Sequence, residues 1–234
     1  VPHQIDGVYY EVVSDANAVV TYRDTQYNSY AGNVVIPATV EIEERVYNVT
    51  SVYNYAFYGS SALTSVTIGE NIETIGYYAF KNCSSLTSVE IPDNVKILEY
   101  QSFMQCESLK TVTLGSGVEH ISGEAFYNCS TLTDLYCRAT TPPEVSSSIV
   151  NNSSSVNLYV PAASMPQYRE ADYWRNFRFI AKEVDGIYYE VTSDSEVKVT
   201  YAGGGYSIVA DEYKGAVEIP GEVKIEDVTY LVTA

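Results

Sequence analysis

Apolar residues in the middle of this chain recur every 23 residues, and this period constrains the fold more than any other feature. Six apolar columns stay in register along the chain, which does not arise by chance. The columns are Phe57, Phe80, Phe103 and Phe126; Leu63, Leu86, Leu109 and Leu132; Val66, Val89, Val112 and Leu135; Ile68, Ile91, Leu114 and Cys137; Ile72, Val95 and Val118; and Val52, Ile75, Leu98 and Ile121. The chain is therefore a repeat protein, in which each repeat buries its apolar side by stacking on its neighbours.

Within one period, the segment Leu63-Thr-Ser-Val66-Thr-Ile68 ends in alternating apolar and polar residues. This alternation predicts a short β-strand whose Val66 and Ile68 side chains face the core. The pattern is the L-x-x-L-x-L signature of a leucine-rich repeat, and the period lies in the range of such repeats. We therefore predict a leucine-rich-repeat solenoid, mainly β, in which 23-residue coils form a short parallel sheet. The phenylalanine column and the Ile75 column should fill the core behind it.

Three of the four cysteines, Cys83, Cys106 and Cys129, also follow the 23-residue step, whereas Cys137 is separate. Successive coils lie about 4.8 Å apart, so distance alone would allow a disulfide. Stacked side chains point the same way, however, so buried free thiols that act as small apolar groups are predicted. His3 and His120 are the only two histidines, and no metal site or other cofactor is predicted.

The segments Ala79-Phe80-Lys-Asn-Cys83-Ser-Ser-Leu86 and Ala125-Phe126-Tyr-Asn-Cys129-Ser-Thr-Leu132 resemble the BspA-like family of bacterial leucine-rich-repeat surface proteins. The resemblance is close over residues 53–138 and looser in the flanks. It implies an extracellular or cell-surface protein, although no signal peptide is present in this chain. It also implies a protein ligand, such as a host extracellular-matrix protein or another cell surface. Cys137 replaces an aliphatic residue of the motif and is expected to mark the end of the array.

The flanking segments are predicted to cap the array, because a terminal coil would otherwise expose apolar area and strand edges. Residues 1–52 should form an antiparallel β cap, with turns at Ser-Asp-Ala-Asn (14–17) and Tyr-Ala-Gly-Asn (30–33). The repeats occupy residues 53–138, and residues 139–181 form a C-terminal cap with one short helix. This helix should run from about Met165 to Trp174 and begin with a capping box at Ser164.

The end of the chain repeats its beginning. Asp185-Gly-Ile-Tyr-Tyr-Glu190 matches Asp6-Gly-Val-Tyr-Tyr-Glu11 at an offset of 179 residues, and later matches follow after a four-residue insertion. Residues 182–234 are therefore predicted to be the β cap of a second, truncated unit. We expect the chain to be a fragment of a longer protein with tandem units.

Several classes of function are disfavoured by composition and motifs. The formal net charge of −17 repels phosphate, so nucleic acid and anionic membrane surfaces are not expected as partners. No apolar run reaches the roughly 18 residues of a membrane span, so no membrane insertion is expected. No P-loop, dinucleotide fingerprint or nucleophile elbow occurs, and a nucleophile–histidine pair is unsupported, so we do not expect an enzyme.

A binding site is expected on the outward face of the strands, because alternate side chains face solvent there. The predicted positions are Ser65, Ser88, Thr111 and Asp134 in one column and Thr67, Glu90, Thr113 and Tyr136 in the next. We expect a surface adhesion or protein-binding module, monomeric, that uses this face. An ordinary solvated sheet in a structural spacer is one alternative. Another is a carbohydrate-binding module that uses Trp174, Phe177, Phe179 and tyrosines, which otherwise form a lid over the last coil.

Overall fold

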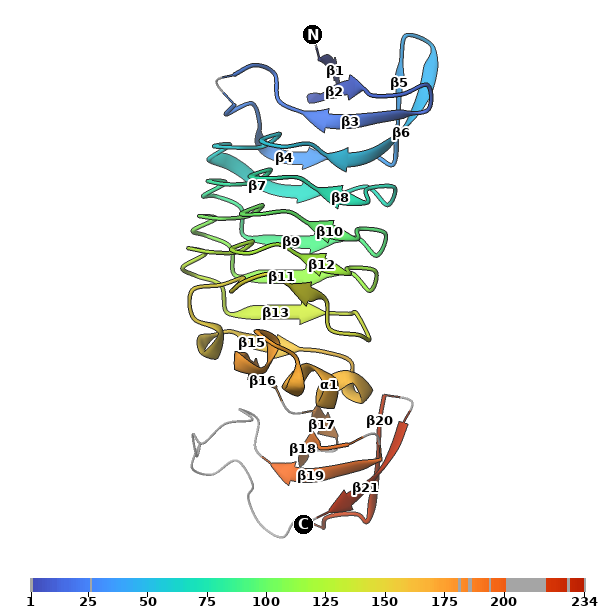
Figure 1. Ribbon diagram of the computed structural model, residues 1–234, viewed down its shortest axis with the longest axis vertical. Coiled ribbons are helices and arrows are strands. Elements are labelled where there is room, and N and C mark those ends of the chain that lie inside the picture. Colours follow the sequence, from blue (N-terminus) through green and yellow to red (C-terminus); the bar gives the residue numbers. More distant parts are fainter. Residues whose placement is uncertain are drawn as a thin grey trace.

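The computed structural model describes residues 2–25, 27–180, 182–184, 187–193, 195–200, 218–226 and 228–233. The chain winds in coils that stack along the long axis of the molecule, with the N-terminus at the top of Figure 1. The described part of residues 182–234, which we call the second copy, lies at the bottom. Each central coil contributes one longer strand and one two-residue strand, and these lie in separate sheets. The apolar core lies between the sheets.

The longer strands form a parallel sheet in the order β16-β15-β13-β11-β9. Its register follows the period, because Val112 lies opposite both Val89 and Leu135, each 23 residues away. The strands are β9 (Ser88–Ile91), β11 (Thr111–Leu114), β13 (Asp134–Cys137), β15 (Asn157–Tyr159) and β16 (Arg178–Phe179). Before them, β7 (Ala62–Thr67) pairs in parallel with β4 (Ala31–Val35) in a sheet of two.

The other sheet has the order β1-β2-β3-β6-β8-β10-β12-β14, and β5 also pairs with β6. Its strands are β1 (His3–Ile5), β2 (Val8–Val12), β3 (Asn17–Thr21), β5 (Thr39–Ile42), β6 (Arg45–Val52), β8 (Thr74–Ile75), β10 (Ile97–Leu98), β12 (His120–Ile121) and β14 (Glu144–Val145). His120 lies opposite Ile97 and Glu144 in this register, as an ordinary member of the strand ladder.

The predicted apolar columns form the core, and their members are all buried. Successive phenylalanine rings stack on one another, for example Phe80 on Phe103, with centroids 4.8 Å apart and planes inclined by 4°. Tyr30 extends this stack beyond the repeats, because its ring lies 4.1 Å from that of Phe57. Its hydroxyl donates to the backbone oxygen of Thr21, so the aromatic stack is tied to β3.

The prediction of buried free thiols is confirmed for the cysteine column. Each thiol donates to the backbone oxygen of the phenylalanine 26 residues earlier, as Cys83 Sγ does to Phe57 O at 3.2 Å. Cys106 and Cys129 repeat the contact at 3.1 and 3.2 Å. The column therefore links each coil to the one before it by a hydrogen bond, and not by a disulfide.

The beginning of the chain differs from the predicted antiparallel cap. The strands β1, β2 and β3 are antiparallel, but β3 pairs in parallel with β6, and β4 in parallel with β7. Such pairs need long crossovers rather than hairpins, and residues 22–44 provide one between β3 and β6. The predicted turn at residues 30–33 is wrong, because Gly32 lies within β4. Gly32 has φ +69° where the register of β4 and β7 shifts, so this glycine serves a β-bulge.

The parallel sheet continues past residue 138, so the expectation that Cys137 ends the array is wrong. Tyr136 of β13 lies opposite Tyr159 of β15, again 23 residues later. Cys137 fits its buried position because its Sγ lies 3.2 Å from the hydroxyl of Tyr168. That hydroxyl donates to Ala139 O at 2.8 Å, so it is free to accept from the thiol.

Helical structure is sparse in the described residues. The α-helix α1 (Met165–Glu170) is accompanied by the 3₁₀ helices η1 (Ser153–Ser155), η2 (Ala162–Ser164) and η3 (Trp174–Asn176). The predicted helix was too long, because the backbone is extended at Ala171 and has a positive φ at Tyr173. The predicted capping box is also wrong, since Ser164 makes no side-chain cap hydrogen bond.

The proposed aromatic platform for sugars at Trp174, Phe177 and Phe179 is contradicted by burial. These side chains are 1%, 5% and 6% exposed. The indole N–H of Trp174 donates to Pro143 O at 2.8 Å, and its ring packs edge-on against Tyr168. A sugar could not reach these ring faces.

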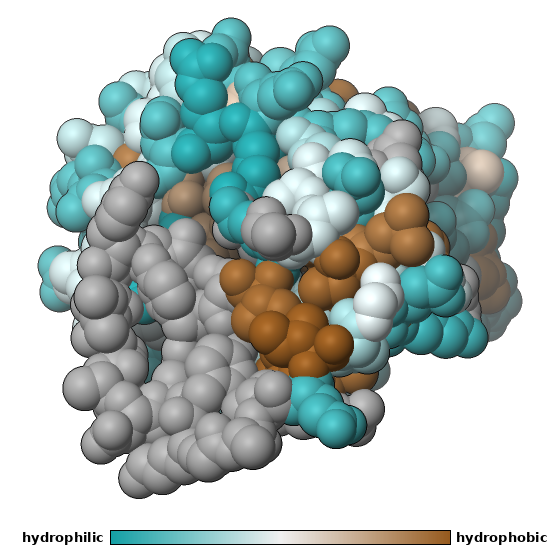
Figure 2. Space-filling model, turned by 90° about the horizontal axis from the view of Figure 1, so that it is seen from below, coloured by the Kyte–Doolittle hydropathy of each residue, from teal (hydrophilic) through white to brown (hydrophobic). Residues whose placement is uncertain are grey.

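Near the C-terminus, a further sheet has the order β17-β18-β19-β21-β20. This order matches β1-β2-β3-β6-β5, and the register also matches, since Tyr189 lies opposite Val199 as Tyr10 lies opposite Val20. The strands are β17 (Lys182–Val184), β18 (Ile187–Val191), β19 (Glu196–Thr200), β20 (Glu222–Ile225) and β21 (Val228–Thr233). Apolar surface gathers at this end of the molecule (Figure 2), where Ile219 and Leu231 are 55% and 50% exposed. None of the described helices is long and apolar enough to cross a membrane.

Candidate binding surface

The predicted outward positions are exposed or half-buried, and each is followed by a buried residue of its strand or coil. The structure brings six of them together in register on β9, β11 and β13, namely Ser88, Thr111 and Asp134 beside Glu90, Thr113 and Tyr136. The other two, Ser65 and Thr67, lie on β7, opposite Asn33 and Val35 of β4. We call the outward side of β7, β9, β11, β13 and β15 the sheet face.

Both columns continue onto β15, where Asn157 and Tyr159 were not predicted as site residues. The rings of Tyr136 and Tyr159 stack with centroids 4.3 Å apart and planes inclined by 9°. Asp134 accepts hydrogen bonds from Asn157 Nδ2 at 3.0 Å and from the hydroxyl of Tyr159 at 3.1 Å. The two tyrosines are thus held in one orientation before any partner arrives.

The protonation states of this cluster are fixed at neutral pH. Burial alone would raise the pKa of Asp134, but hydrogen bonds from Asn157, Thr133 and Tyr159 outweigh burial, and the pKa is lowered. Burial, together with the negative charge of Asp134, raises the pKa of Tyr159 to about 12. An ionised carboxylate therefore faces a neutral phenol.

A cavity of about 490 Å³ adjoins the tyrosine pair at the C-terminal end of the sheet face. Its lining residues are Thr113, Tyr136, Cys137, Arg138, Tyr159, Val160, Pro161 and Glu226. Arg138 Nη1 lies 2.9 Å from Glu90 Oε1, but the two side chains are 55% and 66% exposed, so this ion pair contributes little to stability. The guanidinium can therefore exchange Glu90 for an acceptor on a partner.

One wall of the cavity comes from the second copy. Glu226, in the turn between β20 and β21, accepts a hydrogen bond from the backbone N–H of Ala162 at 3.1 Å. This contact joins the end of the repeat sheet to the second copy.

The residues missed by sequence reasoning had a signal in the period. A further step of 23 from Asp134 and Tyr136 gives Asn157 and Tyr159. Arg138 had no such signal, because its importance comes from its neighbours in space. Within the described part of the chain, no group of three or more His, Cys, Asp or Glu side chains could hold a metal ion.

The stacked coils, their parallel sheets and the L-x-x-L-x-L strands define a leucine-rich-repeat protein, mostly strands with little helix. The model of the BspA-type leucine-rich-repeat region matches residues 29–163 in six copies, which is more than half of the chain. The chain therefore belongs to the BspA-type leucine-rich-repeat family. The match extends on both sides of residues 53–138, in agreement with the parallel pairing of β4 and of β15.

Solved structures of bacterial leucine-rich-repeat proteins are similar to this chain. The leucine-rich-repeat protein of T. pallidum has 19% identity and a TM-score of 0.57, over 76% of this chain and 80% of that chain. A leucine-rich cell surface protein from Faecalibacterium prausnitzii has 19% identity and a TM-score of 0.44, over 87% and 62%. The pneumococcal vaccine antigen PcpA has 18% identity and a TM-score of 0.48, over 86% and 56%. At these identities the likeness shows the fold alone. No curated protein is significantly similar in sequence.

Proposed function

We propose that this chain is a binding module, secreted or at the cell surface, that recognises a protein partner through its sheet face. The partner would be a host extracellular-matrix protein or a protein on another cell, bound by a monomer without enzymatic activity. The observation that carries the proposal is the pre-stacked pair of Tyr136 and Tyr159 beside Arg138 and an open cavity.

Tyrosine and arginine are enriched among the residues that dominate the energy of protein interfaces. A side chain that is already fixed loses little conformational entropy on binding, and hydrogen bonds to Asp134 fix Tyr159 in this way. The small polar residues on β9 and β11 would form the rim around this centre. The net charge of −17 favours a partner whose surface is basic or neutral.

The test measures binding of the full chain to immobilised fibronectin, laminin and collagen. The combined variant Thr67→Ala, Glu90→Ala, Thr113→Ala and Tyr136→Ala should weaken the observed binding at least tenfold, since interface tyrosines are commonly worth about 2 kcal/mol. A matched control is Tyr173→Asn, because Tyr173 is 37% exposed against 39% for Tyr136 and its positive φ suits asparagine. Binding that is unchanged in the combined variant would exclude the sheet face as the site.

A second candidate function is a structural spacer, and the second copy favours it. Because β17–β21 match β1, β2, β3, β5 and β6 in order and register, we infer that residues 182–234 begin another unit. On this view residues 1–52 and 139–181 cap the repeats of the first unit, and a string of units projects another domain. A spacer predicts that none of the sheet-face variants alters adhesion, whereas removal of whole units does.

A further inference from the structure

A second surface of the molecule is lined by tyrosines that the proposed function does not use. Six half-buried tyrosines, Tyr22, Tyr27, Tyr55, Tyr58, Tyr78 and Tyr100, form a connected cluster that we call the tyrosine edge. Ring centroids are 4.8 Å apart for Tyr22–Tyr27, 5.4 Å for Tyr27–Tyr55, 5.1 Å for Tyr55–Tyr78 and 5.9 Å for Tyr78–Tyr100. Tyr55 and Tyr58 lie in the turn after β6, Tyr78 in the turn after β8 and Tyr100 in the turn after β10, so the row runs across successive coils.

The geometry of these turns does not itself require tyrosine. Tyr55 and Tyr78 have φ values of +62° and +57°, a conformation that favours glycine or asparagine. The chain uses Asn82 and Asn128 at the other left-handed position of equivalent turns. Gln101 and Glu124 take the same conformation at the equivalent positions of the next two coils, with φ values of +53° and +61°. This position therefore accepts other side chains, and the turn does not need an aromatic ring there.

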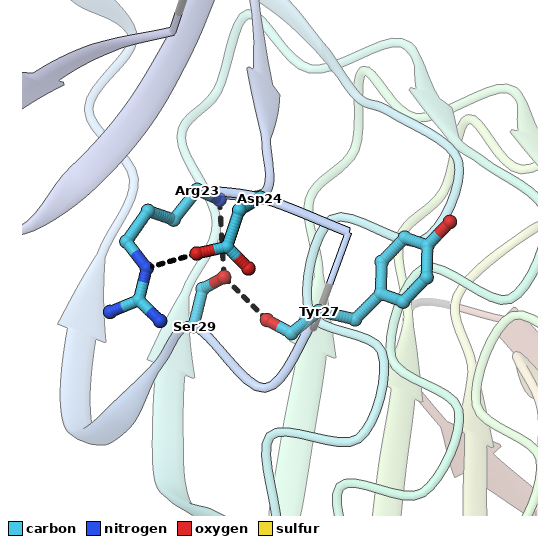
Figure 3. Close-up of polar contacts among 4 residues, drawn as sticks. All are labelled: Arg23, Asp24, Tyr27 and Ser29. Carbon is cyan, nitrogen blue, oxygen red and sulfur yellow. Dashed lines mark hydrogen bonds and ion pairs between the residues drawn. The ribbon is translucent and has the colours of Figure 1, made fainter.

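At its N-terminal end, the tyrosine edge is held by the loop between β3 and β4. Figure 3 shows that Arg23 contacts Asp24 and that the ring of Tyr27 points away from this polar group. Arg23 Nε lies 2.7 Å from Asp24 Oδ2, and the backbone N–H of Arg23 donates to Ser29 Oγ at 3.1 Å. The hydroxyl of Ser29 donates to the backbone oxygen of Tyr27. Tyr27 is thereby held against Tyr55 and Tyr58.

The charged groups on the tyrosine edge are matched within it. The ammonium of Lys81 lies over the ring of Tyr78, 4.8 Å from its centroid, and donates to Gln101 Oε1 at 3.0 Å. The carboxylate of Glu124 accepts from the hydroxyl of Tyr100 at 3.1 Å and from Gln101. Although the protein has a net charge of −17, the charged groups named here, Arg23, Asp24, Lys81 and Glu124, each contact a partner within the strip.

We infer that the tyrosine edge binds an extended, uncharged polysaccharide. A linear row of rings that crosses several coils fits a linear polymer with a repeating unit. Phenol hydroxyls both donate and accept hydrogen bonds, as sugar hydroxyls do, and the rings supply apolar area for sugar C–H groups. Proline-rich peptides fit less well, because they insert into grooves between aromatic rings. Here neighbouring rings contact one another and leave no gap for a proline ring between them.

The test measures binding of the full chain to neutral hexasaccharides of β-1,4-glucan, α-1,4-glucan, β-1,4-mannan and chitin by titration calorimetry. At least one should bind, and its affinity should be the same at low salt and at about 0.5 M salt, since no charge is involved. The double variant Tyr55→Asn and Tyr78→Asn removes two rings and suits the left-handed backbone, so it should fold and should lower affinity about tenfold or more.

The control Tyr136→Ala lies on the sheet face and should leave saccharide affinity unchanged, which separates this inference from the proposed function. Circular dichroism establishes that each variant is folded. The inference is overturned if none of the four hexasaccharides binds, or if the folded double variant binds as tightly as the original chain. Binding of a polyproline decamer that the double variant loses, without saccharide binding, would also overturn it.

Discussion

Replacement of a phenylalanine within the stack should destabilise the protein more than replacement at the end of the stack. Phe103 has two phenylalanine neighbours, Phe80 at 4.8 Å and Phe126 at 5.4 Å, whereas Phe126 has only Phe103 within the column. The rings are 0% and 1% exposed, so burial is the same for both. The two positions therefore differ mainly in the number of stacked neighbours.

The expected magnitude follows from that difference. Leucine retains most of the apolar volume of phenylalanine, and swaps that nearly conserve volume cost less than about 1.5 kcal/mol. Each aromatic pair adds about 0.5–1.5 kcal/mol beyond the area it buries. Phe103→Leu should therefore lower the free energy of unfolding by about 2–4 kcal/mol and Phe126→Leu by about 1–3 kcal/mol, a difference of about 1 kcal/mol.

The assay is equilibrium unfolding in urea, followed by far-ultraviolet circular dichroism and by the fluorescence of the single tryptophan, Trp174. Coincident transitions from the two probes would show that the stack unfolds as one unit and that the free energies can be compared. If the two variants lose equal stability, or if Phe126→Leu loses more, ring stacking is not an additional source of stability along the column.

Three further outcomes are expected. The thiol of Cys106, whose pKa burial raises and whose Sγ donates to Phe80 O, should react with a disulfide reagent only after unfolding; reaction in the folded protein would contradict the buried column. Gly115→Ala should destabilise the protein by about 2 kcal/mol, because a Cβ there would lie 2.5 Å from the backbone of Pro92. An unchanged melting temperature would mean that the two coils can move apart without loss of stability. Asp134→Asn should lower the melting temperature at pH values above about 4 but not at pH values well below 4. The reason is that the pKa of Asp134 is lowered in the folded protein, so the stability it contributes is lost as the pH falls through that pKa. A difference in melting temperature that persists in acid would refute an ionic origin.

The repeat could be predicted from the sequence because its core is periodic, whereas the ends of the array required three-dimensional information. The columns of Phe57 and Val66 are fixed by contacts that recur from each coil to the next. The direction in which β3 pairs with β6 depends on the path of residues 22–44, which carries no periodic signal. In the same way, Gly32 suits a turn and a β-bulge equally, and only its pairing with β7 decides between them.

The candidate site was predicted in part for the same reason. Alternation along a strand predicts that Glu90 and Tyr136 face outward, and the structure places them so. It does not predict that Tyr159 stacks on Tyr136, nor that Arg138 reaches Glu90 two coils away. The tyrosine edge was not predicted at all, because its rings come from turns and from a loop outside the repeats.

Departures from the repeat separate residues that hold the stack from residues available for binding. A position that must pack between two coils keeps one residue type, and a buried departure needs a local partner, as Cys137 finds in Tyr168. An exposed departure has no such constraint, because solvent accepts any polar side chain. Tyr136, where earlier coils carry Thr67, Glu90 and Thr113, is a departure of this kind. Large rigid side chains on the surface are where a partner should make its strongest contacts. A variant of Tyr136 should therefore weaken binding by more than it lowers the free energy of unfolding, which loses only the stacking on Tyr159.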